Sequence, residues 1–206
     1  MSEIHLDTQS EIDTDTNALP IPESGNTDAI FSAIWAWLES GAADRRSATH
    51  LLTMATVTPR FVPAVRTMVL QEVDKQNRSI FSHTHRLAEK LEDLLAQPKV
   101  AWHVYDRRSK TQLVMHGNAS VHFDGKNFAN RWDAVSRMSR VCYERSLPPR
   151  QPLAGSEVAA VDGRDHFAVI QTRIDQIEYL HLKHDGHRGI RFDWTGGGWN
   201  VTELST

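Results

Sequence analysis

The sequence predicts a protein that is mostly β with α, built as an antiparallel β-barrel with peripheral helices. From residue 50 onward, short runs rich in β-branched residues follow one another through short polar turns. Because these runs do not alternate with helices in a βαβ pattern, the sheet is expected to be antiparallel. Three other segments carry apolar residues at steps of three and four, which predicts helices at the periphery. A barrel satisfies both observations, since closure removes free strand edges.

The composition indicates one domain with a polar N-terminal extension. The chain has 206 residues and a formal net charge of −3, so no global basic field points to nucleic acid or to an anionic membrane. Residues 1–26 are acidic and polar and bury too little apolar surface to offset their ordering entropy. We therefore expect a mobile tail over 1–26 and a single domain over 27–206.

The chain lacks the features of a membrane or secreted protein. No run approaches the roughly 18 apolar residues of a spanning helix, and the N-terminus has neither the basic start nor the apolar centre of a signal peptide. Cys142 is the single cysteine, which allows no intrachain disulfide. We expect a cytoplasmic protein in which Cys142 is buried and structural.

The elements of the N-terminal half alternate between one helix and several strands. A helix begins after Asp28 as its cap and ends at Gly41. Three strands follow, separated by turns at 58–60 and 74–78, and they span His50–Val57, Phe61–Val73 and Ser79–Thr84.

The remaining elements follow the same logic. Pro98 stops a helix over Arg86–Ala96, and a second helix spans Asn127–Tyr143. Glu144–Arg164 is rich in proline and glycine and reads as a long surface loop. The other strands are Val100–Tyr105, Gln112–His122, Phe167–Gln171, Gln176–Leu182, Gly189–Trp194 and Trp199–Leu204.

Arg66 is the first candidate for binding an anion. In the strand VRTMVL, alternation puts Arg66 on the same face as Met68 and Leu70. A charge that points into an apolar surface needs a partner. A phosphate could supply one through a bidentate contact, but an internal carboxylate would serve equally, and Arg66 alone favours the carboxylate.

A second cluster follows at the end of a strand. Ser82 and Thr84 are hydroxyl residues on the strand, and His85, Arg86 and Lys90 follow at the start of a predicted helix. Free N–H groups and the positive helix end attract anions there, and Lys90 lies one turn beyond Arg86. Together with Arg66 this cluster suggests a phosphate pocket, although a solvated helix capped by Thr84 is the alternative.

Two further motifs have weaker meaning. The amide of Gln112, in TQLVMHGNA, can both donate to and accept from the edge of a heteroaromatic ring. His181, His184 and His187 are spaced by three across a strand end and a turn, which does not place ligands on one face of a strand. We expect no metal site.

The order of these parts resembles the pyridoxamine 5'-phosphate oxidase family. The resemblance rests on RTMVL, IFSHT, LLAQPKVAWHVYD and TQLVMHGNASV, and it continues in the C-terminal strands to cover roughly residues 45–205. It implies a split barrel that binds FMN, in a homodimer with FMN at the interface. It also implies that Arg66 and Lys90 bind the FMN phosphate and that the backbone from Thr67 lines the flavin ring. The implied cofactor-binding set is Arg66, Thr67, Met68, Val69, Ser82, His83, Thr84, Arg86, Lys90, Gln112 and Arg191.

Departures from the family pattern concern the substrate more than the cofactor. Glu89 stands where the family enzyme of vitamin B6 synthesis has a basic residue, for which His85 or Arg86 could substitute. Gln71 stands where that enzyme has its substrate-phosphate lysine. We therefore expect an FMN-dependent oxidoreductase that transfers hydride between a different small substrate and flavin.

Other functions remain open at this stage. The alternatives are a flavin-binding sensor or carrier without turnover, and a protein of the same fold that binds haem or a deazaflavin. His83 or His116 could assist a proton transfer, although a structural role is the simpler interpretation of each, and no catalytic residue is assigned.

Overall fold

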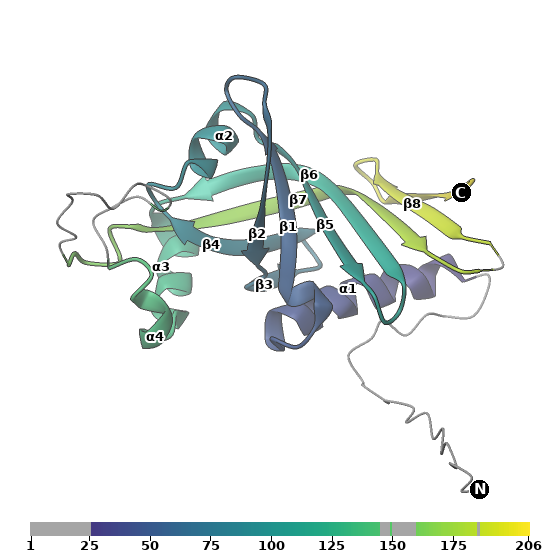
Figure 1. Ribbon diagram of the computed structural model, residues 1–206, viewed down its shortest axis with the longest axis horizontal. Coiled ribbons are helices and arrows are strands. Elements are labelled where there is room, and N and C mark those ends of the chain that lie inside the picture. The colour runs from purple at the N-terminus through teal and green to yellow at the C-terminus, as the bar shows by residue number, and fades with distance from the viewer. Residues whose placement is uncertain (1–25, 145–148, 150–159, 185) are drawn as a thin grey trace, which may run out of the picture.

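The computed structural model describes residues 26–144, 149, 160–184 and 186–206, and these form one nine-stranded antiparallel sheet (Figure 1). The hydrogen-bonded order is β2-β1-β5-β6-β7-β4-β3, and β8 joins β7 and carries β9. The predicted class, an antiparallel split β-barrel with peripheral helices, is confirmed. The strands are β1 Leu51–Val57, β2 Pro63–Val69, β3 Glu72–Asp74, β4 Ser79–His85, β5 Lys99–Asp106, β6 Thr111–His122, β7 Phe167–His181, β8 Arg188–Trp194 and β9 Trp199–Leu204.

The long strand β7 curls the sheet. Its first half pairs with β4 and its second half with β8, while β6 pairs along almost its whole length. At the far end of the path, β4 returns to β2, because Ser82 Oγ donates to the carbonyl of Val69 at 2.8 Å. The N–H of Gln71 also donates to the carbonyl of Phe81 at 2.9 Å. These contacts bring β2 and β4 together without closing a continuous ladder.

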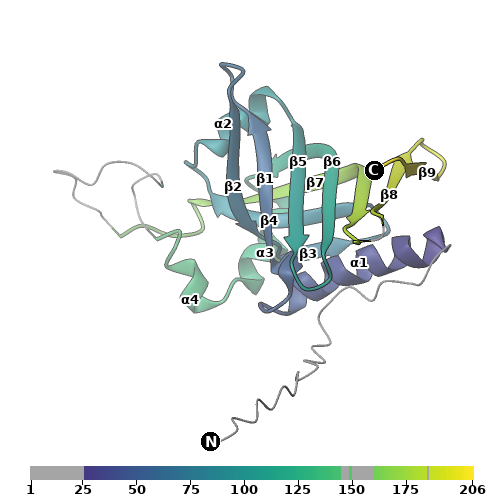
Figure 2. The same cartoon turned by 45° about the vertical axis from the view of Figure 1, so that its right-hand side comes forward.

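The helices lie around the barrel. α1 (Thr27–Ala43) crosses one end and α2 (Lys90–Ala96) lies at the other (Figures 1 and 2). α3 (Gly125–Ala134) and α4 (Arg137–Arg140) lie to one side, where Phe128 and Trp132 of α3 pack with Phe81, Phe167 and Val169. This second cluster is separate from the main core, which joins α1 and α2 to the inner sheet face.

The structure corrects the expected bounds of α1. The cap is Asn26, whose side chain accepts from the N–H of Ala29, and Asp28 lies inside the first turn. Gly41 does not end the helix. A Cβ at Gly41 would lie within 2.7 Å of three atoms of Thr49, so glycine allows the helix to touch the next segment.

Two strand predictions differ from the structure. The expected strand Phe61–Val73 is divided into β2 and β3 by Leu70 and Gln71, where the chain turns toward β4. The two expected strands between residues 167 and 182 are instead one strand. Asp175 has no register partner on β6, so the polar stretch that suggested a break is a β-bulge.

Two helix predictions differ as well. α2 begins at Lys90 and not at Arg86, so residues 86–89 form a turn. The expected helix Asn127–Tyr143 breaks at Val135 and Ser136, where Ser136 caps α4.

Several expectations concern other parts of the chain. The proposed tail and most of the 144–164 loop lie outside the described residues. Cys142 is exposed, which corrects the expectation that it is buried. Within the described residues, no helix has both the length and the apolar character needed to cross a membrane.

Candidate functional site: an anion-binding corner between β2 and α2

Arg66 lies at the edge of the barrel in a closed ring of hydrogen bonds. Its Nη2 donates to Asp93 Oδ2 at 3.0 Å, and its Nη1 donates to Thr56 Oγ1 at 2.6 Å. The Thr56 hydroxyl in turn donates to the same Asp93 oxygen at 2.6 Å. The internal carboxylate that the sequence left open as the partner of Arg66 is therefore Asp93.

The ion pair leaves part of the Arg66 guanidinium available. A guanidinium has five N–H groups. Nη1 makes a second bond, to the carbonyl of Ala64 at 3.2 Å, so three N–H groups are used by the described residues. Nε–H and one Nη2–H make no hydrogen bond within that part of the chain. A bidentate contact to a phosphate needs two such donors.

Lys90 joins Arg66 at one cavity. A hollow of about 120 Å³ is lined by Arg66, Thr67, Ala88, Glu89, Lys90 and Pro149. Lys90 Nζ donates to Thr84 Oγ1 at 3.0 Å, so Thr84 positions the lysine and does not cap a helix. Two cations from segments 24 positions apart thus lie at one hollow, as predicted for a phosphate pocket.

Three predicted ligands do not reach this hollow with their side chains. Ser82 is buried, and its hydroxyl is bound to the carbonyl of Val69. The guanidinium of Arg86 lies 4.8 Å from the ring centroid of Phe123, because the segment that carries it is a turn. His83 points to the opposite face of β4, where its ring meets Phe167 at 4.8 Å.

Among the described residues, the hollow has no basic side chain besides Arg66 and Lys90 that could stand in for the one that Glu89 replaces. His85 stacks against His166 at 4.8 Å, and neither His85 nor Arg86 is among the lining residues. Glu89 itself lines the hollow and is exposed. Within the described part of the chain, the corner therefore carries one carboxylate beside its two cations, in addition to the buried Asp93.

The residues expected along the flavin ring divide between the two faces of the sheet. Met68 is buried in the core, so only its backbone is available to a ligand. Thr67 and Val69 point to the outer face. Directly opposed residues share a face, and one outer row runs through Thr67, Thr53, His103, Val114, Glu178 and Arg191.

Gln112 and Arg191 both belong to this outer face. Gln112 Oε1 lies 3.4 Å from His103 Nε2, beside the row that starts at Thr67. Arg191 Nε donates to Asp193 Oδ2 at 2.9 Å. Arg191 lies five strands from β2, or about 24 Å along the sheet at about 4.8 Å per strand, so the structure does not bring it to Arg66.

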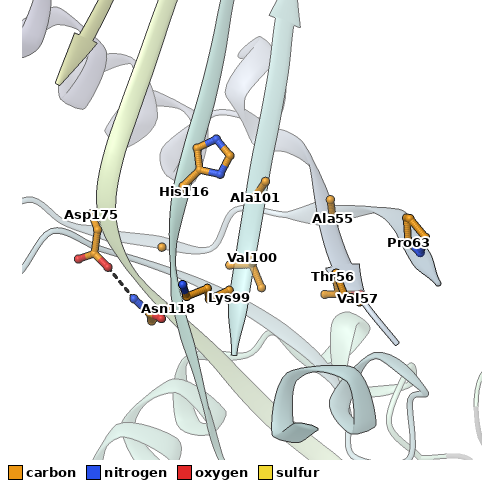
Figure 3. Close-up of a pocket in the computed structure, with 11 residues that line it drawn as sticks. Ala55, Thr56, Val57, Pro63, Lys99, Val100, Ala101, His116, Asn118 and Asp175 are labelled. Carbon is orange, nitrogen blue, oxygen red and sulfur yellow. Dashed lines mark hydrogen bonds between the residues drawn. The ribbon is translucent and has the colours of Figure 1, made fainter. Parts of the chain in front are cut away.

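The outer face also contains a groove of about 570 Å³. His116, Ala101 and Ala55 form its floor on β6, β5 and β1, and Pro63 lies at its far end (Figure 3). Asn118 Nδ2 donates to the bulge residue Asp175 at 2.6 Å at the opposite end. Thr56, which binds Arg66, also lines this groove, so the groove adjoins the cationic corner.

A polar hollow of about 340 Å³ lies between β4 and α3. Its lining residues are Gln71, Glu72, His83, Arg131, Ala134, Val135, Ser136, Ser139 and Tyr143. Arg131 binds Glu72 at 2.7 Å and lies 3.7 Å from the ring centroid of Phe81. His83 Nε2 and Arg131 Nε are buried and have no hydrogen-bond partner among the described residues.

Burial sets the protonation of two groups at this polar hollow. Desolvation, with a smaller repulsion from Arg131, lowers the pKa of His83 to about 4, so its imidazole is neutral at pH 7. Desolvation, with a smaller contribution from Cys142, raises the pKa of Tyr143 to about 12. Both groups are therefore uncharged hydrogen-bonding partners at neutral pH.

The sequence analysis did not identify several of these site residues, although the sequence pattern around one of them could have indicated its role. Asp93 lies between Leu91 and Leu94 on the buried side of α2, and a carboxylate in that position requires an internal partner. Thr56 and Arg131 had no such signal, because their contacts depend on how β1 and α3 pack.

The fold and the cationic corner fit FMN and define an FMN-binding split-barrel domain. The donors at the corner suit a phosphate, and an outer face bearing an amide suits a flavin ring. Residues 32–123 match the family described as "Pyridoxamine 5'-phosphate oxidase, FMN-binding domain". This match confirms the predicted resemblance to the family and the FMN cofactor that it implies.

Two curated relatives cover most of the chain. Dihydrophenazinedicarboxylate synthase of Pseudomonas chlororaphis is 25% identical, covering 95% of this chain and 92% of the relative. Pyridoxine/pyridoxamine 5'-phosphate oxidase of Gluconobacter oxydans (strain 621H) is 26% identical, covering 84% of this chain and 92% of the relative.

Two solved structures share the fold. A pyridoxamine 5'-phosphate oxidase-related, FMN-binding protein of Nostoc punctiforme PCC 73102 has a TM-score of 0.69 and 17% identity, over 85% of this chain and 96% of that one. PhzG of Burkholderia lata 383, in complex with tetrahydrophenazine-1-carboxylic acid, has a TM-score of 0.68 and 17% identity, over 86% and 92%.

Proposed function

We propose that this protein is an FMN-dependent oxidoreductase in which Arg66, Lys90 and Thr84 hold the flavin phosphate. The observation that carries the proposal is the hollow lined by both cations, with two Arg66 N–H groups unused by the described residues. FMN, when bound, supplies hydride and electron transfer, and the protein supplies binding and orientation.

In this proposal the flavin ring lies over the outer sheet face next to the corner. Thr67, next to Arg66, is paired across the strands with Thr53, and Thr53 is paired with His103. Gln112 contacts His103. From β2 to β6 is three strand spacings, or about 14 Å, which is comparable with the extended length of FMN. Gln112 would then hydrogen-bond the ring edge.

We also propose a homodimer, which the outer face and the position of Arg191 support. Apolar side chains are exposed there, among them Leu51 at 54%, Val65 at 66% and Tyr105 at 43%. A two-fold axis would bury this patch against its copy and could bring the partner's Arg191 to the flavin held by the first protomer. Within one chain, Gln112 lies beside the proposed flavin position but Arg191 does not, and this favours a second protomer that supplies Arg191.

The substrate side is the polar hollow of His83, Arg131 and Tyr143. It begins at Gln71, two residues beyond the strand segment proposed to line the ring. His83 and Arg131 each offer a buried nitrogen that has no partner within the described ranges, and a substrate could satisfy it. The P. chlororaphis and B. lata relatives act on or bind phenazine carboxylic acids by their names, so reduced aromatic carboxylic acids are the substrates to try first.

Spectroscopy of the purified protein tests the proposal. We expect a flavin absorbance spectrum, bound FMN by mass spectrometry, and bleaching of the flavin by a substrate in the absence of oxygen. A protein that binds no FMN would refute the cofactor site. A flavoprotein that no candidate substrate reduces would favour the flavin-binding sensor or carrier.

A single substitution tests the dimer. Val65→Glu places a charge within the exposed apolar patch, and we expect a shift from dimer to monomer in sedimentation velocity. Arg60→Glu, in the β1–β2 turn, is the matched control and should leave the dimer intact. A wild-type monomer at micromolar concentration with bound FMN would contradict the shared site.

A further inference from the structure

The buried ring formed by Arg66, Thr56 and Asp93 has a consequence for how the corner binds an anion. Asp93 is 5% exposed and Thr56 3% exposed, so both partners of the guanidinium lie in the interior. The ring uses Nη1 and Nη2 on its buried side. Nε–H and one Nη2–H are left for the hollow, within the described residues.

We propose that Asp93 and Thr56 are positioning residues for the flavin phosphate, which they select by fixing the orientation of Arg66. This inference rests on the proposed FMN site. An arginine side chain has many rotamers, and holding it in one orientation costs entropy that reduces binding. The hydrogen bonds to Thr56 and Asp93 order the Arg66 side chain when the protein folds. The corner therefore has its binding geometry before the cofactor binds.

The closed form of the ring supports positioning over simple neutralisation. A carboxylate alone could pair with Arg66 in several orientations. The Thr56 hydroxyl accepts from Nη1 and donates to Asp93 Oδ2, while Nη2 donates to that same oxygen. Three contacts among three groups leave one orientation of the guanidinium plane, which is the geometry that bidentate phosphate binding requires.

Asp93 also has an opposing effect, because its negative charge repels a phosphate. The two effects can be separated by substitution. Asp93→Asn keeps an oxygen that can accept from both Thr56 and Arg66 but removes the charge. Asp93→Ala removes the acceptor and the charge together. Thr56→Val removes the hydroxyl and keeps the branched shape, and Thr56→Ser keeps the hydroxyl.

The test is the ratio of the dissociation constants for riboflavin and FMN, measured by flavin fluorescence quenching. This ratio isolates the phosphate, because both ligands share the ring and the ribityl chain. We expect Asp93→Ala to lower the ratio about tenfold and Thr56→Val to lower it several-fold. Thr56→Ser should restore the wild-type ratio, and Asp93→Asn should lose less than Asp93→Ala.

A neighbouring carboxylate provides the control. Glu92→Ala removes the same charge from α2 at an exposed position that makes no ion pair with Arg66. It should leave the ratio unchanged. General misfolding would weaken the binding of both flavins together and would not change their ratio.

The outcomes distinguish this inference from the proposed function. A wild-type protein that binds neither flavin contradicts the FMN site itself. A wild-type protein that prefers FMN, with a ratio unchanged or raised in Asp93→Ala, overturns the positioning role. If Asp93→Ala does not fold, the test is the riboflavin-to-FMN ratio of dissociation constants in Thr56→Val compared with Thr56→Ser. Equal ratios in these two variants overturn the inference.

Discussion

The cationic corner and the polar hollow lie on opposite faces of the same strand, β4, and they differ in how their buried polar groups are satisfied. At the corner, Thr84 binds Lys90, and Arg66 is held by Thr56 and Asp93. At the hollow, His83 Nε2 and Arg131 Nε are buried and find no partner in the part of the chain that the structure describes. Buried polar groups without partners are costly.

This difference separates a site organised in advance from a site that needs its ligand. The corner can receive a phosphate without rearranging, because its cations are already oriented. The hollow gains hydrogen bonds only when water or a substrate enters it. We therefore assign the tightly held cofactor to the corner and the exchanging substrate to the hollow.

The largest expected effect is at the corner. Arg66→Ala should weaken FMN binding about 100-fold, because it removes a charge-assisted bidentate contact, and should change riboflavin binding much less. It should also destabilise the protein, since it leaves Asp93 buried and unpaired. Titration of both flavins measures the effect. Arg66→Lys is the matched variant, because it keeps the positive charge but loses the paired N–H donors of the guanidinium. Unchanged FMN affinity in Arg66→Ala would remove the phosphate assignment.

At the hollow, the expected effect is a pH dependence of stability. The pKa of His83 is about 4 in the folded chain and 6.5 in the reference state, so the unfolded chain binds the proton first as the pH falls. The stability due to neutral His83 is complete above pH 6.5 and is lost as the pH falls toward 4, with about 2 kcal/mol of it lost between pH 7 and pH 4.5. Urea unfolding at pH 7 and pH 4.5 measures this loss.

His83→Asn is the variant that isolates this contribution. It removes the titrating group and retains a polar side chain, so the difference in unfolding free energy between the two pH values should shrink by about 2 kcal/mol. His122→Asn provides the comparison, because His122 is a half-buried histidine that is bound to Gln171 and lies two strands from His83 in the same cross-strand row. If the free energy of unfolding depends equally on pH in the wild type and in His83→Asn, then His83 is not a buried, neutral imidazole.

The smallest expected effect concerns the exposed carboxylate at the corner. Glu89→Gln removes a negative charge from the lining of the hollow and should tighten FMN binding about threefold, because exposed charges interact weakly. The gain should shrink in 0.5 M salt as screening increases. Isothermal titration at two salt concentrations measures it. A loss of affinity would mean that Glu89 supports the site.

The sequence predicted the strands and helices better than the breaks and the bulge within them. β1, β4, β5, β6 and β9 fall close to their expected bounds because alternation and turn residues are local signals. The breaks at Leu70 and Val135 and the bulge at Asp175 were misplaced. Each depends on a contact with a distant strand or helix, such as the hydrogen bond from Gln71 to Phe81 that ends β2.

What the sequence determined by itself was the barrel class and the two cations of the corner, Arg66 and Lys90. These follow from periodicity, from residue chemistry and from the family resemblance that their spacing carries. Only the tertiary structure decided the roles of their neighbours. It paired Arg66 with Asp93, turned His83 to the far face of β4, and placed Arg191 five strands from β2. The physical reason is that side-chain partners are chosen by the packing of segments far apart in the chain, whereas local patterns fix only which face each residue presents.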